Sequence, residues 1–300
     1  MDPAGPLFLN VFIAIFFDNS PRHRSFLEGR PYASSMVQKS NRKFHDRIAG
    51  QYDRIYDSPY WRFYREISWD HLKKFLPETR PATAGDLGCG TGWFGLRLAK
   101  SGFHLIFLDP SGGMLARARE NLEALNRPIE ARYIQAGLED MGEIEDQSLS
   151  FATAQGDPLS FCKNPRRALL ELRRILKPGA TCVLSVDHRV AGLKALSQGK
   201  TPGPFLDLLK TGRTEWKAHR SEEGFPMKMF DAHELQALAK KTGFETLSLI
   251  GKTCLVQRSN ETWLEDPLQR KRLIRAEEEV HGLPPYFGLA SHLQIALRRT

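Results

Sequence analysis

The sequence predicts an α/β fold, in which a doubly wound, mostly parallel sheet carries helices on both faces. Between residues 81 and 190, short apolar segments alternate with amphipathic ones, and this strand–helix order is typical of parallel sheets. Phe103–Leu108 is apolar throughout, as expected of a strand that is buried on both faces. The 300 residues are 41% hydrophobic and 26% charged, so the chain can bury a large core without disulfides or metal.

The elements are expected in a regular order. Helices at 43–51 and 62–76 precede the first strand because Pro77 and Pro81 end the helical region. Ser111 and Asp231 are side chains that favour helix N-caps, and Pro165 suits the first turn of a helix. We predict strands at 83–87, 103–108, 130–135, 149–154, 181–186, 244–250 and 292–298, and helices at 93–100, 111–125, 165–176, 232–241 and 261–280, the last interrupted near Pro267.

Charge and cysteine content exclude several classes of protein. The net charge is +8, and residues 81–190 are neutral, so the basic excess lies in the flanks. The densest basic cluster, 270–275, is followed at once by three glutamates, which favours a solvated helix face over a binding patch. The four cysteines form no CxxC pair, so we expect no metal site, no disulfide framework and a cytoplasmic location.

The segment Asp86–Gly92 is the motif that carries chemistry. It reads Asp-Leu-Gly-Cys-Gly-Thr-Gly, between a predicted strand and a predicted helix. Its glycines allow a sharp turn and a close approach to a ligand, and the helix N-terminus presents free N–H groups. Asp109 follows the next strand, 21 residues after Gly88, where an acid can accept hydrogen bonds from ribose hydroxyls.

Two cofactors compete for this geometry. The dinucleotide fingerprint requires a small residue at the position of Trp93. Asp86 at the entrance of the loop repels phosphate but suits an ammonium group. S-adenosylmethionine carries an ammonium and a sulfonium and no phosphate, so the sequence favours it over NAD.

These motifs, with Leu176-Lys177-Pro178-Gly179, resemble the class I S-adenosylmethionine-dependent methyltransferases over about residues 43–255. Within that class the chain is most similar to small-molecule methyltransferases of the quinone-biosynthesis type. The resemblance implies a seven-stranded Rossmann-like sheet. It also implies a set of cofactor-binding residues: Tyr52, Asp86, Gly88, Cys89, Gly90, Thr91, Gly92, Asp109, Pro110, Met114, Leu138 and Gln155. Where many relatives have an aspartate that reaches the adenine, this chain has Gly137, and Glu139 or Asp140 is the alternative.

The resemblance also suggests a domain organisation. Residues 1–42 are an N-terminal extension that we expect to be mobile, and its apolar run 7–17 is too short to span a membrane, which needs about 20 residues. That run either packs on the body or contacts a membrane surface. We expect a helical lid at 43–80, the cofactor-binding core at 81–190, a cap or insertion at 191–230, and completion of the sheet at 231–300.

Candidates for acceptor chemistry come from strand ends and from the lid. Methyl transfer requires alignment above all, and a general base only when the acceptor atom carries a proton. Asp157 and His188 follow predicted strands and are the candidate catalytic and substrate-binding residues, although a turn cap and a surface histidine are equally ordinary roles for them. Tyr52 and Tyr56 either pack in the core or cover the sulfonium, because aromatic faces attract cations.

The sequence therefore leaves three functional hypotheses. The first is a methyltransferase that acts on a small hydrophobic or aromatic acceptor by in-line displacement. The second is an RNA or protein methyltransferase, which the basic flanks favour, although no RNA-binding signature and no amino-methylation motif accompany them. The third is a module that binds S-adenosylmethionine without catalysis. We expect no nucleic acid partner and no transmembrane segment.

Overall fold

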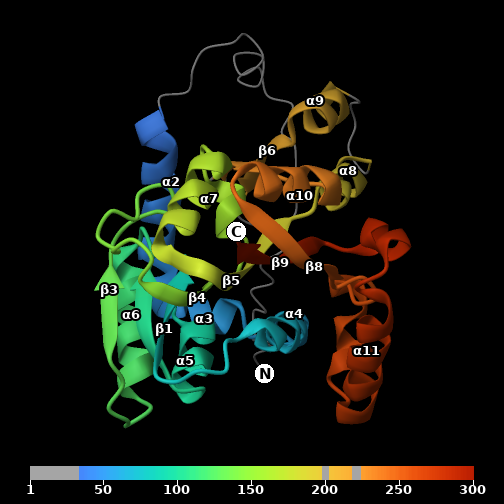
Figure 1. Ribbon diagram of the computed structural model, residues 1–300. Helices are drawn as coiled ribbons and strands as arrows, with labels where there is room; N and C mark the ends of the chain where they lie inside the picture. The colour runs from blue at the N-terminus through green and yellow to red at the C-terminus, as the bar shows by residue number, and fades with distance from the viewer. Residues whose placement is uncertain (1–33, 198–202, 218–223) are drawn as a thin grey trace, which may run out of the picture.

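The computed structural model describes residues 34–197, 203–217 and 224–300, which form a seven-stranded sheet flanked by helices (Figure 1). The strand order is β3-β2-β1-β4-β5-β9-β8. The strands are β1 (Ala82–Leu87), β2 (Phe103–Leu108), β3 (Ala131–Ile134), β4 (Leu149–Ala154), β5 (Leu176–Asp187), β8 (Phe244–Lys252) and β9 (His292–Arg299). β1 to β5 pair in parallel, and β9 runs antiparallel to both β5 and β8. The predicted fold class, an α/β fold with a mostly parallel sheet, is confirmed.

Helices cover both faces of the sheet because successive strand side chains point to opposite faces. One core is shared by the sheet with α7 (Pro165–Ile175) and α10 (Ala232–Lys241). A second core, on the other face, is shared with α5 (Trp93–Lys100), α6 (Gly112–Glu123) and the end of α4 (Pro59–Leu72). Figure 1 shows α7 and α10 on the opposite side of the strands from α5 and α6.

The local predictions hold best where apolar periodicity and caps agree. The elements predicted at 93–100, 103–108, 149–154 and 232–241 have those bounds. The Ser111 and Asp231 side chains accept hydrogen bonds from the backbone N–H of Met114 and Glu234, so both cap their helices as predicted.

Several boundaries differ from the prediction, and those of β5 and α2 differ by five residues or more. β5 begins at Leu176 and runs through Pro178 and Gly179, because Leu176 pairs with Leu149 across a register shift. The first described helix, α2, spans Ser34–Ile48 and so begins nine residues before the predicted helix. The apolar run 7–17 lies outside the described residues. None of the described helices is long and apolar enough to cross a membrane.

The segment before β1 folds as several short helices rather than two. α2 is followed by η2 (Ala49–Gln51), α3 (Tyr52–Ile55), α4 and η3 (Lys73–Phe75). Pro59 occupies the first turn of α4, so Tyr52 and Tyr56 belong to a different helical unit from Tyr60 and Tyr64. α4 buries Tyr60, Phe63, Tyr64 and Ile67 in a cluster with residues of β8 and of the segment after it.

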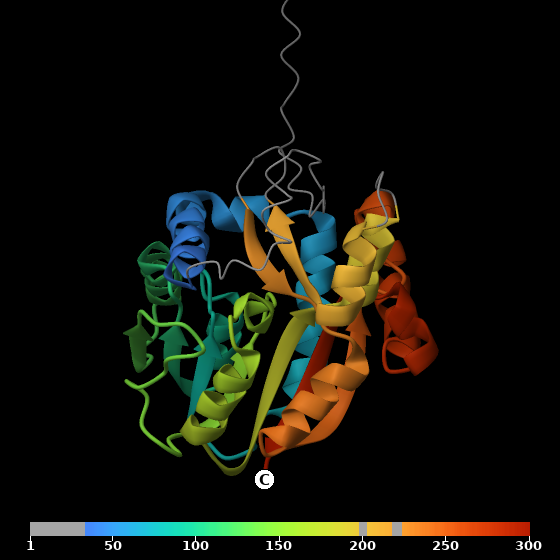
Figure 2. The same cartoon turned by 90° about the horizontal axis from the view of Figure 1, so that it is seen from above.

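The insertion between β5 and α10 forms a small cap. It contains α8 (Arg189–Leu196), α9 (Gly203–Thr211) and a two-stranded sheet of β6 (Arg213–Lys217) and β7 (Gly224–Lys228). Trp216 and Phe225 stack within it, with ring centroids 4.5 Å apart, and Phe44 of α2 packs against Trp216 at 5.2 Å. Figure 2 shows α2 and this hairpin at the same end of the sheet.

The remaining elements lie after β4 and between β8 and β9. A single turn, η4 (Pro158–Phe161), follows β4. η5 (Arg258–Leu264), α11 (Pro267–Val280) and η6 (Pro284–Leu289) separate β8 from β9, with the predicted interruption at Pro267. Glu277 of α11 is buried and accepts hydrogen bonds from the N–H groups of Cys254 and Leu255, which fixes α11 to the end of β8.

Candidate active site

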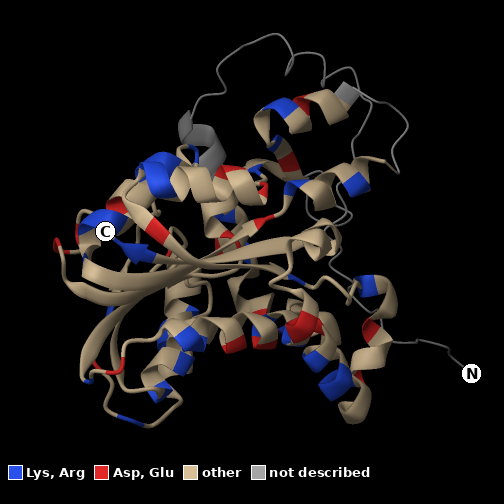
Figure 3. Ribbon diagram, turned by 45° about the vertical axis from the view of Figure 1, so that its right-hand side comes forward, with Lys and Arg blue, Asp and Glu red and all other residues tan. Residues whose placement is uncertain are grey.

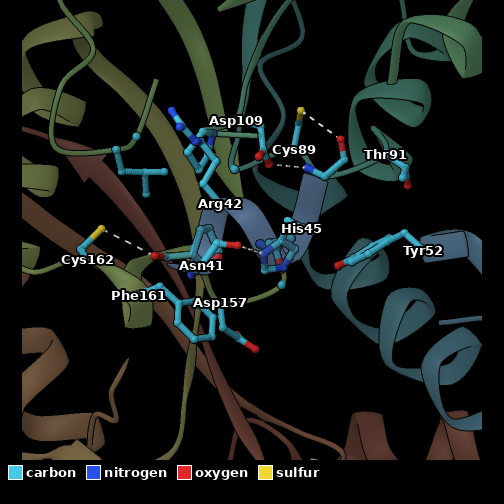
Figure 4. A pocket seen from close by; sticks show the side chains of 18 of the residues that line it. Asn41, Arg42, His45, Tyr52, Cys89, Thr91, Asp109, Asp157, Phe161 and Cys162 are labelled. Carbon is cyan, nitrogen blue, oxygen red and sulfur yellow. Dashed lines mark hydrogen bonds between the residues drawn. The ribbon is translucent and has the colours of Figure 1, made fainter. Parts of the chain in front are cut away.

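A cavity of about 750 Å³ opens at the carboxyl ends of the parallel strands, within the range typical of small-molecule sites. Its floor is made by the loops after β1, β2 and β4, and its walls by α2, α3, α4 and the β6–β7 hairpin. In Figure 4, Asp109 and Cys89 lie at one end, Asp157 and Phe161 lie at another, and side chains of α2 occupy the region between them.

The glycine loop after β1 borders the cavity and has a backbone that favours glycine. Gly88, Gly90 and Gly92 have φ values of 72°, 52° and 84°, all in the left-handed region. A Cβ on Gly88 would lie 2.7 Å from Cβ of Pro158, and a Cβ on Gly92 would lie 3.1 Å from that of Ala118. The loop can therefore adopt this path only with glycine at both positions.

Asp109 organises the loop from the adjacent strand. One carboxyl oxygen accepts the N–H of Gly90 at 2.9 Å, and the other accepts the N–H of Ser111 at 2.9 Å. Burial raises the pKa of Asp109, and the two backbone donors oppose that shift. Each carboxyl oxygen keeps a further lone pair, so Asp109 can accept hydrogen bonds from two vicinal hydroxyls.

Three of the predicted cofactor residues do not line the cavity. Asp86 is buried beneath α5, where its carboxyl group accepts the N–H of Gly95 at 2.7 Å. Gly92 and Met114 also lie outside the cavity wall. This hydrogen bond connects β1 to α5. Burial raises the pKa of Asp86 to about 8. The expected contact between Asp86 and an amino group is not part of this geometry.

The other predicted cofactor residues do line the cavity: Tyr52, Gly88, Cys89, Gly90, Thr91, Asp109, Pro110, Leu138 and Gln155. Gln155 donates its amide N–H to the carbonyl of Val183 at 3.1 Å. Its Oε1 is buried and has no hydrogen-bond partner among the described residues. Glu139 and Asp140, the alternatives to the missing aspartate at Gly137, also border the cavity.

These residues fit S-adenosylmethionine. The ribose diol of S-adenosylmethionine can donate hydrogen bonds to Asp109. Its ammonium group can donate to a buried acceptor such as Oε1 of Gln155. A Cβ on Gly90 would have only the Tyr52 ring within 4 Å, at 3.8 Å, so the loop leaves space for a ligand between them. Tyr52 and Tyr56 form a pair with ring centroids 4.5 Å apart at the wall of this space.

The two predicted catalytic candidates have different positions. Asp157 lines the cavity and has a left-handed backbone, with φ of 67°, which is uncommon for a residue other than glycine and typical of functional sites. His188 does not line the cavity, and its Nδ1 lies 3.0 Å from the carbonyl oxygen of Ala290. We therefore do not retain His188 as a candidate base or substrate ligand, because its ring is taken up by structural contacts.

No signal in the sequence identified His292. It lines the cavity, as was expected of His188. β9 pairs antiparallel with β5 in a register that sets His292 beside Asp187. His292 Nδ1 lies 2.7 Å from Oδ2 of Asp157 and 3.8 Å from Oδ1 of Asp187. The ligand atoms of these three buried side chains lie within 4.8 Å of one another, close enough to share a cation, although no metal site was expected.

Lys252 and Tyr64 complete the cluster beneath the cavity. Lys252 is fully buried, and its Nζ donates to the Tyr64 hydroxyl at 2.7 Å and to Oγ of Ser68 at 3.2 Å. The Tyr64 hydroxyl in turn lies 3.4 Å from Asp157. Burial lowers the pKa of Lys252 to about 7, although Asp157 and Asp187 favour its charged form. A lysine beside the two carboxylates reduces their net negative charge and so makes a metal a less favourable occupant.

Aromatic side chains form the rest of the wall. Trp61 of α4, Phe161 after β4, and Trp216 and Phe225 of the hairpin border the cavity. The sequence predicted that the insertion at 191–230 would help to build the acceptor pocket, but no local pattern singled out Trp216 and Phe225 within it. The wall favours an apolar or aromatic ligand at the end of the cavity away from Asp109.

Comparisons with known proteins agree with this geometry. Residues 85–179 match a family described as a methyltransferase domain. The chain is 36% identical over 122 residues to malonyl-[acyl-carrier protein] O-methyltransferase of Erwinia pyrifoliae, a match covering 38% of this chain and 41% of that protein. It is 23% identical over 266 residues to tRNA 5-carboxymethoxyuridine methyltransferase of Escherichia coli, covering 86% of this chain and 97% of that protein.

A solved structure shares the fold. It is an S-adenosylmethionine dependent methyltransferase from Mesorhizobium loti, with a TM-score of 0.51 and 19% identity, and the match covers 78% of this chain and 98% of that one. The glycine loop and Asp109 lie within the matched region. Residues 85–179 thus match a methyltransferase domain, and the chain shares the fold of a solved S-adenosylmethionine-dependent methyltransferase.

Proposed function

We propose that this protein transfers the methyl group of S-adenosylmethionine to a small hydrophobic or aromatic acceptor held in the cavity. The observation that carries the proposal is that one cavity joins the glycine loop and Asp109 to an aromatic wall. The sulfonium supplies an activated methyl group, which an acceptor can take by in-line displacement. The chain contributes alignment and exclusion of water, through α2, α3 and the hairpin that cover the space.

An RNA acceptor is the second candidate, and the long match to a tRNA methyltransferase is the observation that favours it. Two features of this chain speak against it. Basic and acidic residues are interspersed along the helices in Figure 3 rather than gathered into a stripe. The cavity wall also includes Trp216 and Phe225, whose rings pack against Phe44. These side chains narrow the access of an RNA acceptor to the glycine loop.

The test is methyl transfer from S-adenosylmethionine labelled in its methyl group. The purified protein is incubated in parallel with a small-molecule metabolite extract, with total RNA and with a protein extract. We expect labelled product in the small-molecule arm alone. Label in RNA or protein would replace this proposal by the second candidate, and cofactor binding without label in any arm would indicate a non-catalytic binding module. The Asp109→Asn variant controls for transfer that does not depend on the site.

A further inference from the structure

Arg65 of α4 borders the cavity and is incompletely paired within the protein. Its side chain is 17% exposed. Among the described residues, its one ion pair is a contact of 3.5 Å between Nη2 and Oδ1 of Asp57. Its Nε is buried and has no hydrogen-bond partner among those residues. The guanidinium therefore borders a ligand cavity with only a long contact to a carboxylate.

The two carboxylates that act on Arg65 are engaged by other groups. Asp57 accepts hydrogen bonds from Nε and Nη2 of Arg62 at 2.9 and 2.6 Å. Asp53 accepts the hydroxyl of Thr91 at 2.5 Å. Both carboxylates favour the charged form of Arg65, but burial outweighs them and lowers its pKa. Because an arginine keeps its proton in a protein, this partly buried charge is stabilised by a further anion.

Arg65 lies at the end of the cavity where the glycine loop is. Its guanidinium carbon is 5.2 Å from the ring centroid of Trp93, the first residue of α5 and the next residue after Gly92. Its charge also acts on Tyr52, and a Cβ on Gly90 would lie 3.8 Å from the Tyr52 ring. The guanidinium is thus close to the space that the glycine loop leaves for a ligand.

The N-terminus of α5 adds backbone donors to the same region. Trp93 and Phe94 are the first two residues of this helix and both border the cavity. Their N–H groups have no partner within the helix. The next N–H group, that of Gly95, is donated to Asp86. Because the N-terminus of a helix carries a partial positive charge, it favours an anion together with Arg65.

The other cationic side chains in the described part of the cavity wall are less suited to hold an anion. Arg42 of α2 is exposed, so water and salt screen its charge. Nδ1 of His292 lies 2.7 Å from the carboxylate of Asp157. The charge of His45 acts on Asp109 and lowers its pKa. Among the described residues, the wall thus has one partly buried guanidinium without a close carboxylate.

S-adenosylmethionine has one anionic group, the carboxylate of its methionine part. A carboxylate suits a guanidinium, because two parallel N–H groups can donate to its two oxygens. Asp109 can accept the ribose hydroxyls and Oε1 of Gln155 the ammonium group, but neither side chain is a donor for the carboxylate at those atoms. Arg65 supplies the donors that the ligand still requires.

We propose that Arg65, together with the N-terminus of α5, binds the methionine carboxylate of S-adenosylmethionine and so determines which sulfonium ligand the cavity accepts. The inference rests on the function proposed above for the identity of the ligand. Decarboxylated S-adenosylmethionine has the same adenosine, ammonium and sulfonium groups but no carboxylate. It gains no ion pair with Arg65, and its two positive charges are repelled by the guanidinium. The site therefore selects the methyl donor over its decarboxylated form.

Calorimetric titration with the two ligands tests the proposal. Arg65→Met removes the guanidinium. Arg97→Met is the matched control, because the guanidinium carbon of Arg97 lies 3.4 Å from the ring centroid of Trp93 but Arg97 does not border the cavity. We expect the wild type and Arg97→Met to bind S-adenosylmethionine about 10–100-fold more tightly than the decarboxylated form. In Arg65→Met this preference should disappear, because only the affinity for S-adenosylmethionine falls.

Three results would overturn the inference. The first is a wild type that binds both ligands equally well, a comparison that needs no variant and holds even if Arg65→Met does not fold. The second is an equal loss of affinity for both ligands in a folded Arg65→Met, which would show that Arg65 only supports the wall. The third is normal binding of S-adenosylmethionine by Arg65→Met with a raised KM for the acceptor, which would assign the anion to the acceptor.

A second variant separates charge from geometry. Arg65→Lys keeps the positive charge but loses the pair of parallel donors, so it should retain part of the preference for S-adenosylmethionine. A preference as weak as that of Arg65→Met would contradict an ion pair at this position. A wild type that binds neither ligand would contradict the proposed function as well. The expected preference without labelled product in any arm of the transfer assay would support this inference and contradict the proposed function alone.

Discussion

Asp86 and Asp109 lie at the carboxyl ends of the neighbouring strands β1 and β2, and they differ in what surrounds them. Asp86 is enclosed beneath α5 with Gly95 as its hydrogen-bond donor. Asp109 borders the cavity and accepts two backbone N–H groups, so it both shapes the glycine loop and faces the ligand. The spacing in the sequence located both acids, but it did not show which of the two buried side chains would border the cavity.

The burial of Asp86 predicts a dependence of stability on pH. Its pKa is raised from 3.8 to about 8 in the folded protein, so the folded state binds a proton more tightly than the unfolded state. The stability that Asp86 contributes is complete below about pH 4 and is lost as the pH rises to about 8. A pKa that differs by one between the folded and unfolded states corresponds to about 1.4 kcal/mol.

The Asp86→Asn variant cannot ionise and should escape this loss. We expect its free energy of unfolding, measured by denaturant titration without ligand, to improve relative to the wild type from pH 5 to pH 8. Asp140→Asn, an exposed change at the cavity rim, is the control. Parallel pH profiles for the wild type and Asp86→Asn would show that Asp86 is ionised in the folded protein.

At the scale of elements, α2 and α3 are fastened to the loops that would hold the cofactor. Asp46 of α2 accepts the Ser111 hydroxyl at 2.6 Å and the N–H of Gly113 at 3.2 Å, at the start of α6. Asp53 of α3 accepts the hydroxyl of Thr91 at 2.5 Å, within the glycine loop. These contacts hold α2 and α3 against the glycine loop and the start of α6, where the lid that the resemblance implies would lie.

The lid hypothesis predicts slower hydrogen exchange of residues 43–64 when S-adenosylmethionine is added. Asp46→Ala should weaken that protection and speed dissociation of the ligand, because α2 loses its contacts with the start of α6. Glu66 of α4 pairs with Arg270 of α11, so Glu66→Ala controls for the loss of an acidic side chain outside α2 and α3 and should leave the exchange like that of the wild type. If this segment exchanges at one rate with and without ligand, it is a fixed wall, and Tyr52 and Tyr56 serve packing alone.

The sequence predicted helices and strands well where a local signal exists. Caps such as Ser111, the glycine loop and the apolar period of 103–108 act through neighbouring residues, so the prediction needs no tertiary information. The bounds of β5 and the start of α2 escaped prediction because they depend on pairing and packing across the molecule.

At the scale of the whole molecule, the sequence located most of the side chains that line the cavity around the glycine loop, but fewer of those at the other end, where Asp157 is one that it did locate. Around the glycine loop, the residues from Gly88 to Pro110 that line the cavity lie close together in the sequence, at the ends of two neighbouring strands. The other end of the cavity joins Trp61, Asp157 and His292, and the last is 135 residues from Asp157 along the chain. Only the antiparallel insertion of β9 between β5 and β8 brings His292 to the cavity, and no pattern in the sequence specifies that register.

The cofactor assignment, and with it the proposed methyl transfer to an acceptor, depends on which ligand binds at the glycine loop. Calorimetric titration measures this binding directly. We predict that S-adenosylmethionine binds at one site per chain and that NAD does not bind. Asp109→Ala should weaken the binding by about 1.5–3 kcal/mol for each charge-assisted hydrogen bond lost, while its thermal unfolding stays cooperative. Tight binding of NAD with no response to S-adenosylmethionine would contradict both assignments.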